Sequence, residues 1–309
     1  MSYSWCSFAD MGTEISGSGS IYQSGTARFG LRRRLGKRLE RLYGAPGDGT
    51  RCGFIRYGTV FRYLLEYGMA ADDIIEAWFR KLTRLMDLDG EELAALTALS
   101  FRREETEANR YLVKEGTQVT RCCLLVDGYV ARHKMSRNGR RQIVSFHMSG
   151  DMLDLQHTLL SRADHNLQTM TRAVVAWIPI TELAQVASRF PRVAAAFARD
   201  ALIDAAIFRE WVLNVGARDA KTRIAHMLCE FVQRREALGI ASVEAVELPF
   251  SQEQIGDATG LTSVHVNRML RELTEEGAFA RTGRHYCIAD WRKLQAIADF
   301  NPAYLHQMA

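Results

Sequence analysis

The side chains with the clearest chemical potential occupy one face of a short helix expected from residue 263. Val264, Arg268 and Arg271 recur at helical spacing, and His265 and Asn267 flank them. A face that only met water would usually carry paired Glu and Lys residues. Small, amide and guanidinium side chains instead match base edges and phosphates in a major groove. The alternative interpretation is an ordinary helical hairpin with a solvated face.

The neighbouring residues predict how this face is positioned. Ser251 and Gln254 have the spacing of a capping box, so a first helix is expected to begin there. Gly260 suits the turn between the helices, and Thr262 or Ser263 can cap the second helix. The residues expected to face inward are Ile255 and Ala258 on the first helix and Val266, Met269, Leu270 and Leu273 on the second.

The segment after these helices predicts a basic β-hairpin. Gly277 ends the helix, and two apolar stretches, 278–280 and 286–288, flank a turn that carries Arg281 and Arg284. Helix, turn, helix and hairpin in this order are typical of a winged helix-turn-helix. The two arginines would contact phosphates, which position a protein on DNA without reading its sequence.

Composition limits the class of protein. Of the 309 residues, 47% are hydrophobic and 25% are charged, as in an ordinary globular protein with two domains. We find no apolar run long enough to span a bilayer and no signal peptide. The six cysteines are scattered and suggest neither a disulfide framework nor a zinc site. A cytoplasmic protein without a membrane span is therefore expected.

Charge is spread unevenly along the chain. The net charge is +4, and residues 1–68 contribute +5 through ten basic and five acidic residues, so the remainder carries about −1. Any nucleic-acid surface in the folded part must therefore be local.

Residues 1–68 are predicted to form a disordered basic tail. Residues 1–26 are rich in Ser and Gly, and residues 27–43 have the pattern of a basic amphipathic helix. Such a helix could touch a membrane surface or nucleic acid, although a weakly ordered tail is the plainer interpretation. A third interpretation is that translation starts at Met69, where globular patterning begins, so that the tail is not made.

Residues 69–190 are predicted to form a sensor domain of short strands. Residues 71–107 have helical patterns, and from residue 109 to 179 apolar runs alternate with evenly spaced turn signals. Asn138–Gly139 is the strongest hairpin signal among them. This pattern predicts a small antiparallel sandwich, which we interpret as a jelly roll. The expected strands are 111–113, 122–126, 129–135, 142–148 and 173–178.

Residues 191–216 are predicted to form a long dimerisation helix. The segment is apolar along a broad stripe and rich in alanine, which allows a second helix to approach closely. The alternative is an internal core helix. Gly216 is expected to break this helix and Asp219 to cap the next one, over 220–238. The winged helix-turn-helix domain is assigned to residues 217–309.

The order of these parts resembles the Crp/Fnr family of transcription regulators, which includes the cyclic-AMP receptor protein and the fumarate–nitrate regulator. The resemblance covers roughly residues 75–295 and is most specific in residues 218–225 and 250–273. It implies an α+β fold with an N-terminal cyclic-nucleotide-binding-like β jelly roll, a long dimerisation helix and a C-terminal winged helix-turn-helix. It also implies a homodimer that binds an inverted repeat of double-stranded DNA, and RNA polymerase as a partner if the protein is an activator.

Two departures from the family limit the effector. In the cyclic-nucleotide members, the Gly-Asp pair that matches Gly150–Asp151 is followed by a Gly-Glu-Leu segment. These members later hold the cyclic phosphate with an Arg-Ser pair. Here residues 152–156 read Met-Leu-Asp-Leu-Gln, and the later pair falls near Ala163–Asp164. Because a phosphate needs cationic or N–H donors, cyclic-AMP binding is not expected. A clustered set of cysteines is also missing, which argues against an iron–sulfur cluster. We therefore assign no cofactor and no metal.

The resemblance also assigns roles on the second helix. Arg268 matches the arginine with which the family contacts a guanine, whereas Ser263 and Val264 replace the Arg and Glu of its other two reading positions. Val264 cannot accept a hydrogen bond from cytosine, but its methyl groups can pack on a thymine methyl. A different target site is therefore expected. The predicted DNA-binding residues are Ser251, Gln252, Thr262, Ser263, Val264, His265, Asn267, Arg268, Arg271, Arg281 and Arg284.

The remaining reactive side chains are expected to serve packing. Cys122–Cys123 could sense redox state, but on a strand at most one of the two would be exposed, and Cys229 reads as a core residue. Three histidines near the expected ligand pocket could bind a metal or haem. Their spacing matches no ligand motif, so surface or loop histidines are favoured. These three are His147, His157 and His165.

An enzyme is not expected, because the sequence has no recognisable nucleophile–base arrangement, Gly-rich phosphate loop or paired acids. The leading interpretation is a homodimeric, sequence-specific regulator. The alternative is a sensory or scaffold module that meets a partner or a membrane through residues 27–43 and does not read DNA.

Overall fold

The computed structural model describes residues 73–238, 248–282 and 285–306. The predicted tail over residues 1–68, its amphipathic helix and Arg284 lie outside these residues. Within them, no helix is long and apolar enough to cross a membrane.

Two helices precede the sheets: α3 (Asp73–Leu85) and α4 (Gly90–Thr97). Asp89 caps α4, because its carboxylate accepts hydrogen bonds from the backbone N–H groups of Glu91 and Glu92. The helical pattern expected up to residue 107 is wrong at its end, since residues 102–106 form an edge strand paired with residues 173–177. The ladder of backbone hydrogen bonds there outweighs the local helical pattern.

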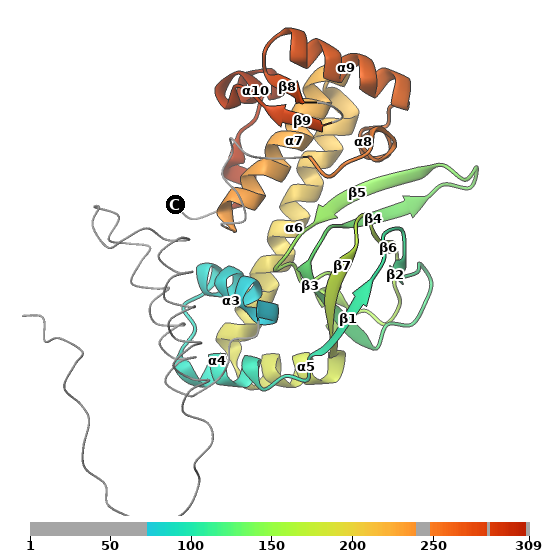
Figure 1. The fold of residues 1–309 in the computed structure, drawn as a ribbon. Coiled ribbons are helices and arrows are strands. Elements are labelled where there is room, and N and C mark those ends of the chain that lie inside the picture. The colour runs from blue at the N-terminus through green and yellow to red at the C-terminus, as the bar shows by residue number, and fades with distance from the viewer. Residues whose placement is uncertain (1–72, 239–247, 283–284, 307–309) are drawn as a thin grey trace, which may run out of the picture. The chain divides into compact units, whose positions relative to one another are not determined.

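The strands form two antiparallel sheets, as the sandwich interpretation predicted (Figure 1). One sheet has the order β1–β7–β3, and the other has the order β2–β6–β4–β5. Apolar side chains from both sheets fill the space between them, among them Leu125, Val130, Leu167 and Val175. The bounds are β1 Arg102–Thr106, β2 Tyr111–Val113, β3 Arg121–Asp127, β4 Val130–Met135, β5 Arg141–His147, β6 Asn166–Thr169 and β7 Ala173–Pro179.

Strand β6 and helix α5 were not predicted either. Strand β6 has only four residues and a polar sequence, so it lacks the alternation of a half-buried strand. It is nevertheless central, because it pairs with both β2 and β4. Helix α5 (Ile180–Arg189) follows β7 directly and packs against the longer helix after it.

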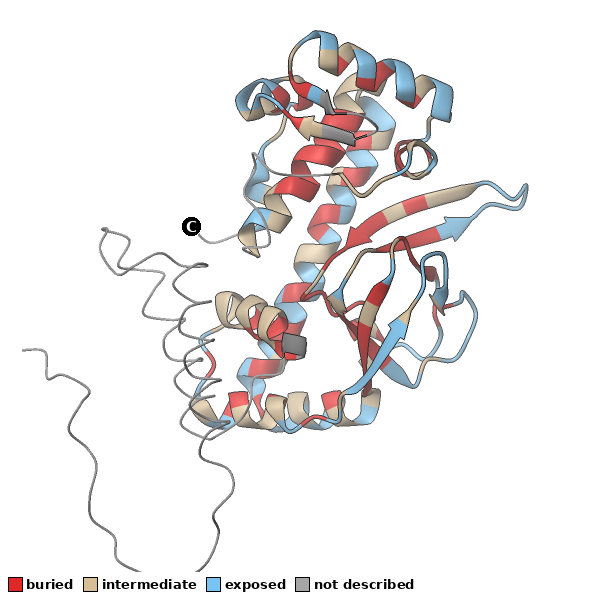
Figure 2. Cartoon of the chain, in the orientation of Figure 1, coloured by how far each residue is buried: buried red, intermediate tan, exposed pale blue. Residues whose placement is uncertain are grey.

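That longer helix, α6 (Pro191–Ala217), extends beyond its predicted end. Gly216 lies inside it, so the expectation that this glycine breaks the helix is wrong. A glycine inside a helix costs only about 1 kcal/mol, and here the chain turns instead at Arg218, which is extended. Figure 2 shows buried and exposed residues alternating along α6. Val193, Phe197 and Trp211 pack inward, whereas other apolar side chains face solvent.

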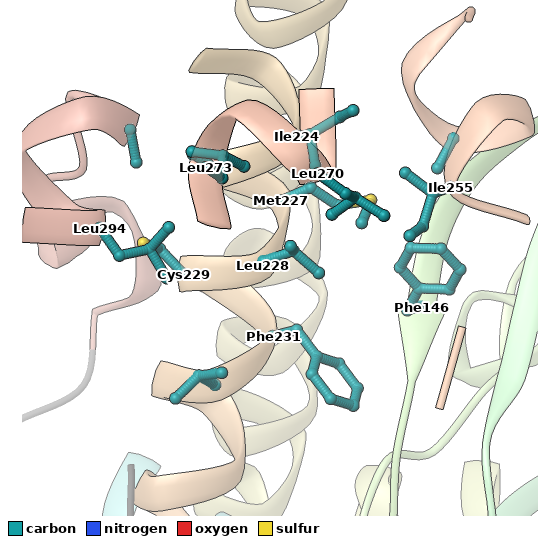
Figure 3. Packing of buried hydrophobic residues seen from close by; sticks show 14 of the residues in the cluster. Phe146, Ile224, Met227, Leu228, Cys229, Phe231, Ile255, Leu270, Leu273 and Leu294 are labelled. Atoms are coloured by element: carbon teal, nitrogen blue, oxygen red, sulfur yellow. The ribbon is translucent and has the colours of Figure 1, made fainter. Parts of the chain in front are cut away.

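The C-terminal part contains α7 (Ala220–Ala237), α8 (Gln252–Thr259), α9 (Ser263–Glu275), the β8–β9 hairpin (Phe279–Thr282 and His285–Ile288), α10 (Trp291–Ala298) and η3 (Pro302–Leu305). Asp219 caps α7 as expected. Buried side chains of α7, α8 and α9 meet in one core, which Figure 3 shows around Leu228, Ile255 and Leu270. Phe146 of β5 belongs to the same cluster, so the β-domain packs directly against these helices.

Candidate nucleic-acid interface

The turn between α8 and α9 is built as the sequence predicted. Ser251 Oγ accepts a hydrogen bond from the Gln254 N–H at 3.1 Å, and Gln254 Oε1 accepts one from the Ser251 N–H at 2.8 Å. Gly260 ends α8 in the left-handed region, with φ of 72°. Gly256 is also constrained, because a Cβ atom there would lie 2.6 Å from the Leu261 carbonyl oxygen. The two helices therefore approach each other closely at this turn.

Thr262, rather than Ser263, caps α9. The Thr262 side chain accepts a hydrogen bond from the His265 N–H at 3.3 Å, and Ser263 becomes the first residue of the helix. The predicted inward stripe of α9 is buried, as are Ile255 and Ala258 on α8. Packing of this stripe leaves the opposite face of α9 directed to solvent.

That opposite face carries most of the residues predicted to contact DNA. Val264 is 82% exposed at the start of α9, which is unusual for a β-branched apolar side chain. Arg268 Nη2 donates a hydrogen bond to His265 Nε2 at 2.9 Å. Asn267 Nδ2 donates one to Gln252 Oε1 at 3.3 Å, which links the two helices. These contacts orient polar side chains across the front of the hairpin.

The two arginines of α9 are exposed and only weakly paired. Arg268 Nε lies 3.9 Å from Glu272, and Arg271 Nε lies 3.6 Å from Glu275, each one turn further along the helix. Exposed ion pairs of this kind contribute little to stability. A phosphate or a base edge can therefore replace either glutamate at low cost.

The basic hairpin is present, since β8 and β9 pair antiparallel with Thr282 opposite His285. Arg281 lies on β8 opposite Tyr286. The Arg281 side chain and the whole of Arg284 lie outside the part of the chain that the structure describes. Their contacts with phosphates remain predictions.

Contacts from two other elements hold the helix pair, and sequence reasoning missed both. Arg223 of α7 donates hydrogen bonds to the carbonyl oxygens of Thr259 at 2.7 Å and Arg218 at 3.0 Å. From β5, Arg141 Nε donates to Asp257 Oδ2 at 2.6 Å, and Gln142 Nε2 donates to the Ala258 carbonyl at 3.1 Å. The β4–β5 hairpin thus contacts α8 directly and can transmit a change in the β-domain to the interface.

A cavity of about 670 Å³ lies where β4 and β5 meet α3, α6 and α7. Most of its cationic side chains are paired with carboxylates. Lys81 Nζ lies 2.8 Å from both Asp151 and Asp200, and Arg132 Nη1 lies 2.6 Å from Asp204. The sequence did not identify these residues, because they come from separate elements.

Asp151 is the centre of this charge cluster. Burial disfavours its charged form, but the charges of Lys81 and Arg234 outweigh burial and hold the pKa of Asp151 well below its usual range. Arg234 Nη2 donates to Asp151 Oδ2 at 2.9 Å, so the carboxylate joins α3 and α7 to the β-domain.

The expectation of surface or loop histidines was wrong with respect to exposure. His147, His157 and His165 are all buried, at 4–5% exposure.

Cys122 and Cys123 are both buried as well, because β3 is covered on both faces. Burial raises the pKa of the Cys122 thiol to about 12, so little reactive thiolate forms, and the packing role expected of these cysteines is confirmed.

Comparison with known proteins agrees with this architecture. Residues 103–190 match the family described as cyclic nucleotide-binding domain, and residues 222–297 match the Crp-like helix-turn-helix domain. Among solved structures, FixK2 from Bradyrhizobium japonicum aligns with a TM-score of 0.59 and 24% identity, over 64% of this chain and 98% of that one. A c-di-GMP-responsive regulator, CLP of Xanthomonas campestris, aligns with a TM-score of 0.54 and 16% identity, over 65% of this chain and 100% of that one.

The proteins related to this chain in sequence include transcription regulators. The anaerobic regulatory protein of Aggregatibacter actinomycetemcomitans is 23% identical over 69% of this chain and 83% of its own length. The transcriptional activator FnrL of Cereibacter sphaeroides is 24% identical over 67% of this chain and 84% of its own length. These relatives confirm that the chain is a regulator and not an enzyme. With its Crp-like helix-turn-helix and its cyclic-nucleotide-binding-type domain, the chain belongs to the Crp/Fnr family of DNA-binding transcription regulators.

Proposed function

We propose that the protein binds an inverted-repeat operator as a homodimer, with α9 of each protomer in successive major grooves about one helical turn apart. The exposed face of α9 carries this proposal, because Val264, Arg268 and Arg271 are directed outward, opposite the buried stripe of Val266, Met269, Leu270 and Leu273. Because the proposed target is chromosomal DNA, we place the protein in the cytoplasm. We expect RNA polymerase as a partner if the protein activates transcription.

The dimer is supported by a second face of α6. Leu202 is 66% exposed, and Phe208 and Val212, which lie four residues apart, are 43% and 64% exposed. Exposed alanines 198, 201 and 205 lie beside them and would let another helix approach closely. An exposed apolar stripe on a helix of 27 residues fits pairing with α6 of a second copy.

The operator can be identified by selecting bound duplexes from a random library. Wild type should enrich a palindrome, and Arg268→Ala should lose the enriched guanine and bind that palindrome about 5- to 150-fold more weakly, the loss expected for one bidentate base contact. Arg271→Ala is the matched control, because it removes an equally exposed arginine expected to contact phosphate and should weaken binding to all sequences alike. If no sequence enriches, the alternative of a scaffold module that does not read DNA is favoured.

Val264 is predicted to set part of the sequence preference through apolar contact with a thymine methyl. Val264→Glu should shift the selected base at that step from T·A to C·G, because a carboxylate accepts a hydrogen bond from cytosine N4. The side chain is exposed, so the fold should be unaffected. The same selected sequence for wild type and Val264→Glu would contradict this role.

We further propose that the effector is not a cyclic nucleotide. Among the cations that line the cavity, Lys81, Arg132 and Arg234 are each paired with at least one carboxylate. Ala163 and Asp164 stand where the family would place its phosphate-binding pair. A cyclic phosphate would have to displace these carboxylates and face Asp164, which opposes its binding.

A further inference from the structure

Three buried side chains of the β-domain converge beside the cavity. Asp154 precedes the short helix η1 (Leu155–Thr158), His157 lies within it, and His165 directly precedes β6. One ligand atom from each residue lies within 4.8 Å of the other two. The side chains of Asp154 and His157 are fully buried, and that of His165 is 7% exposed.

Each histidine is held so that its Nε2 atom faces the carboxylate of Asp154. His157 Nδ1 lies 2.9 Å from the Leu160 carbonyl oxygen, and His165 Nδ1 lies 2.6 Å from Asp164 Oδ1. Because a carbonyl oxygen only accepts hydrogen bonds, Nδ1 carries the proton in a neutral His157 ring. His165 has a carboxylate oxygen at each ring nitrogen, so a neutral ring can donate to only one of the two. The Nε2 atoms of His157 and His165 lie 3.8 Å and 3.0 Å from Asp154 Oδ1.

This arrangement lacks a positive centre. His157 Nε2 and Asp154 Oδ2 are buried, and neither finds a hydrogen-bond partner among the described residues. A protonated His165 between Asp154 and Asp164 would satisfy His165 alone. It would leave the other two atoms without partners, which is costly for buried polar groups.

We propose that Asp154, His157 and His165 bind one divalent first-row transition-metal ion. Two imidazoles and a carboxylate form a donor set that suits Zn²⁺ and Fe²⁺. Metal–ligand bonds of about 2.1 Å in a tetrahedral site place ligand atoms about 3.4 Å apart, and the observed 3.0 Å and 3.8 Å lie on either side of that value.

The surroundings match those of metal-binding histidines. Such histidines usually donate their second N–H to a carbonyl or a carboxylate, which fixes the ring and raises its basicity. Leu160 and Asp164 accept these two bonds here. Gln156 Nε2 also donates to Asp154 Oδ1 at 3.3 Å, which orients the carboxylate. Since His165 lines the cavity, an ion can reach the site from it, and three protein ligands leave a coordination position for water or an effector.

Metal titration of the purified full-length chain, stripped with a chelator and without an affinity tag, tests the proposal. Zn²⁺ should bind at one ion per chain with micromolar or tighter affinity, and Co²⁺ should give the visible absorption of a site with nitrogen and oxygen ligands. His157→Gln and Asp154→Asn should each weaken Zn²⁺ binding at least about 100-fold, because a primary ligand is lost. His147→Gln is the matched control, since it alters a buried histidine outside the cluster and should leave the affinity unchanged.

The Asp164→Ala variant distinguishes weaker metal binding caused by a changed site from weaker metal binding caused by misfolding. The Asp164 side chain is 82% exposed, so its removal should not disturb packing, yet it frees the His165 ring and should weaken Zn²⁺ binding about 10- to 100-fold. No saturable binding of Zn²⁺, Co²⁺ or Fe²⁺ to wild type would overturn the proposal, as would equal affinities for wild type, Asp164→Ala and His157→Gln. The measurement contains no DNA, so its outcome is independent of whether the proposed operator is found.

Discussion

Replacing Asp151 with alanine is expected to lower the free energy of unfolding by about 3–5 kcal/mol, because it removes a buried carboxylate that pairs with two half-buried cations. Asp151 Oδ1 accepts a hydrogen bond from Lys81 Nζ at 2.8 Å, and Oδ2 accepts one from Arg234 Nη2 at 2.9 Å. Lys81 keeps a second carboxylate, Asp200, so the lower end of the range is expected. Urea denaturation at neutral pH measures the difference.

Glu105→Ala is the control for this loss of charge. Glu105 pairs with Arg172 at 2.6 Å, but both side chains are largely exposed, and such a pair contributes less than about 1 kcal/mol. If Asp151→Ala and Glu105→Ala were equally stable, the buried cluster would not hold the domains together.

The same carboxylate predicts how stability depends on pH. The folded-state pKa of Asp151 lies well below the unfolded value of about 3.9, so the folded protein binds fewer protons between the two values. Its contribution is complete above about pH 5 and is lost as pH falls below about 4. Asp151→Asn should therefore show a flatter decline in stability between pH 5 and pH 3 than wild type.

The second large effect is expected from the exposed stripe of α6. Phe208→Glu places a charge where the proposed dimer would bury an apolar ring, so the protein should become monomeric in sedimentation experiments. Binding of the second half-site would no longer be intramolecular, and affinity for the palindrome should fall about 10²- to 10⁴-fold. Binding to a single half-site should change little.

Met135→Glu is the matched control, because Met135 is an equally exposed apolar side chain at the end of β4. It should leave both the oligomeric state and the DNA affinity unchanged. A Phe208→Glu protein that stays dimeric and keeps its affinity would show that this stripe is not the interface.

The helix-turn-helix could be predicted in detail because its signals are local. The capping box of Ser251 and Gln254, the left-handed Gly260 and the inward stripe of α9 each depend on residues within a turn or two of one another. The cap of α7 at Asp219 and the hairpin at Gly139 were predictable for the same reason. Residues 102–106 and Gly216 were misassigned, because tertiary pairing and packing outweighed weak local signals there.

The sequence by itself determined the helix-turn-helix with its hairpin, the family and the outward face of α9, since helical spacing and turn residues specify these without reference to distant parts of the chain. Only the tertiary structure decided what surrounds the cavity. Asp154 and His165 are eleven residues apart and meet because the polar strand β6 pairs centrally in its sheet. Asp151 and Arg234 meet across 83 residues. Such contacts leave no periodic trace in the sequence, because each depends on the packing of several elements at once.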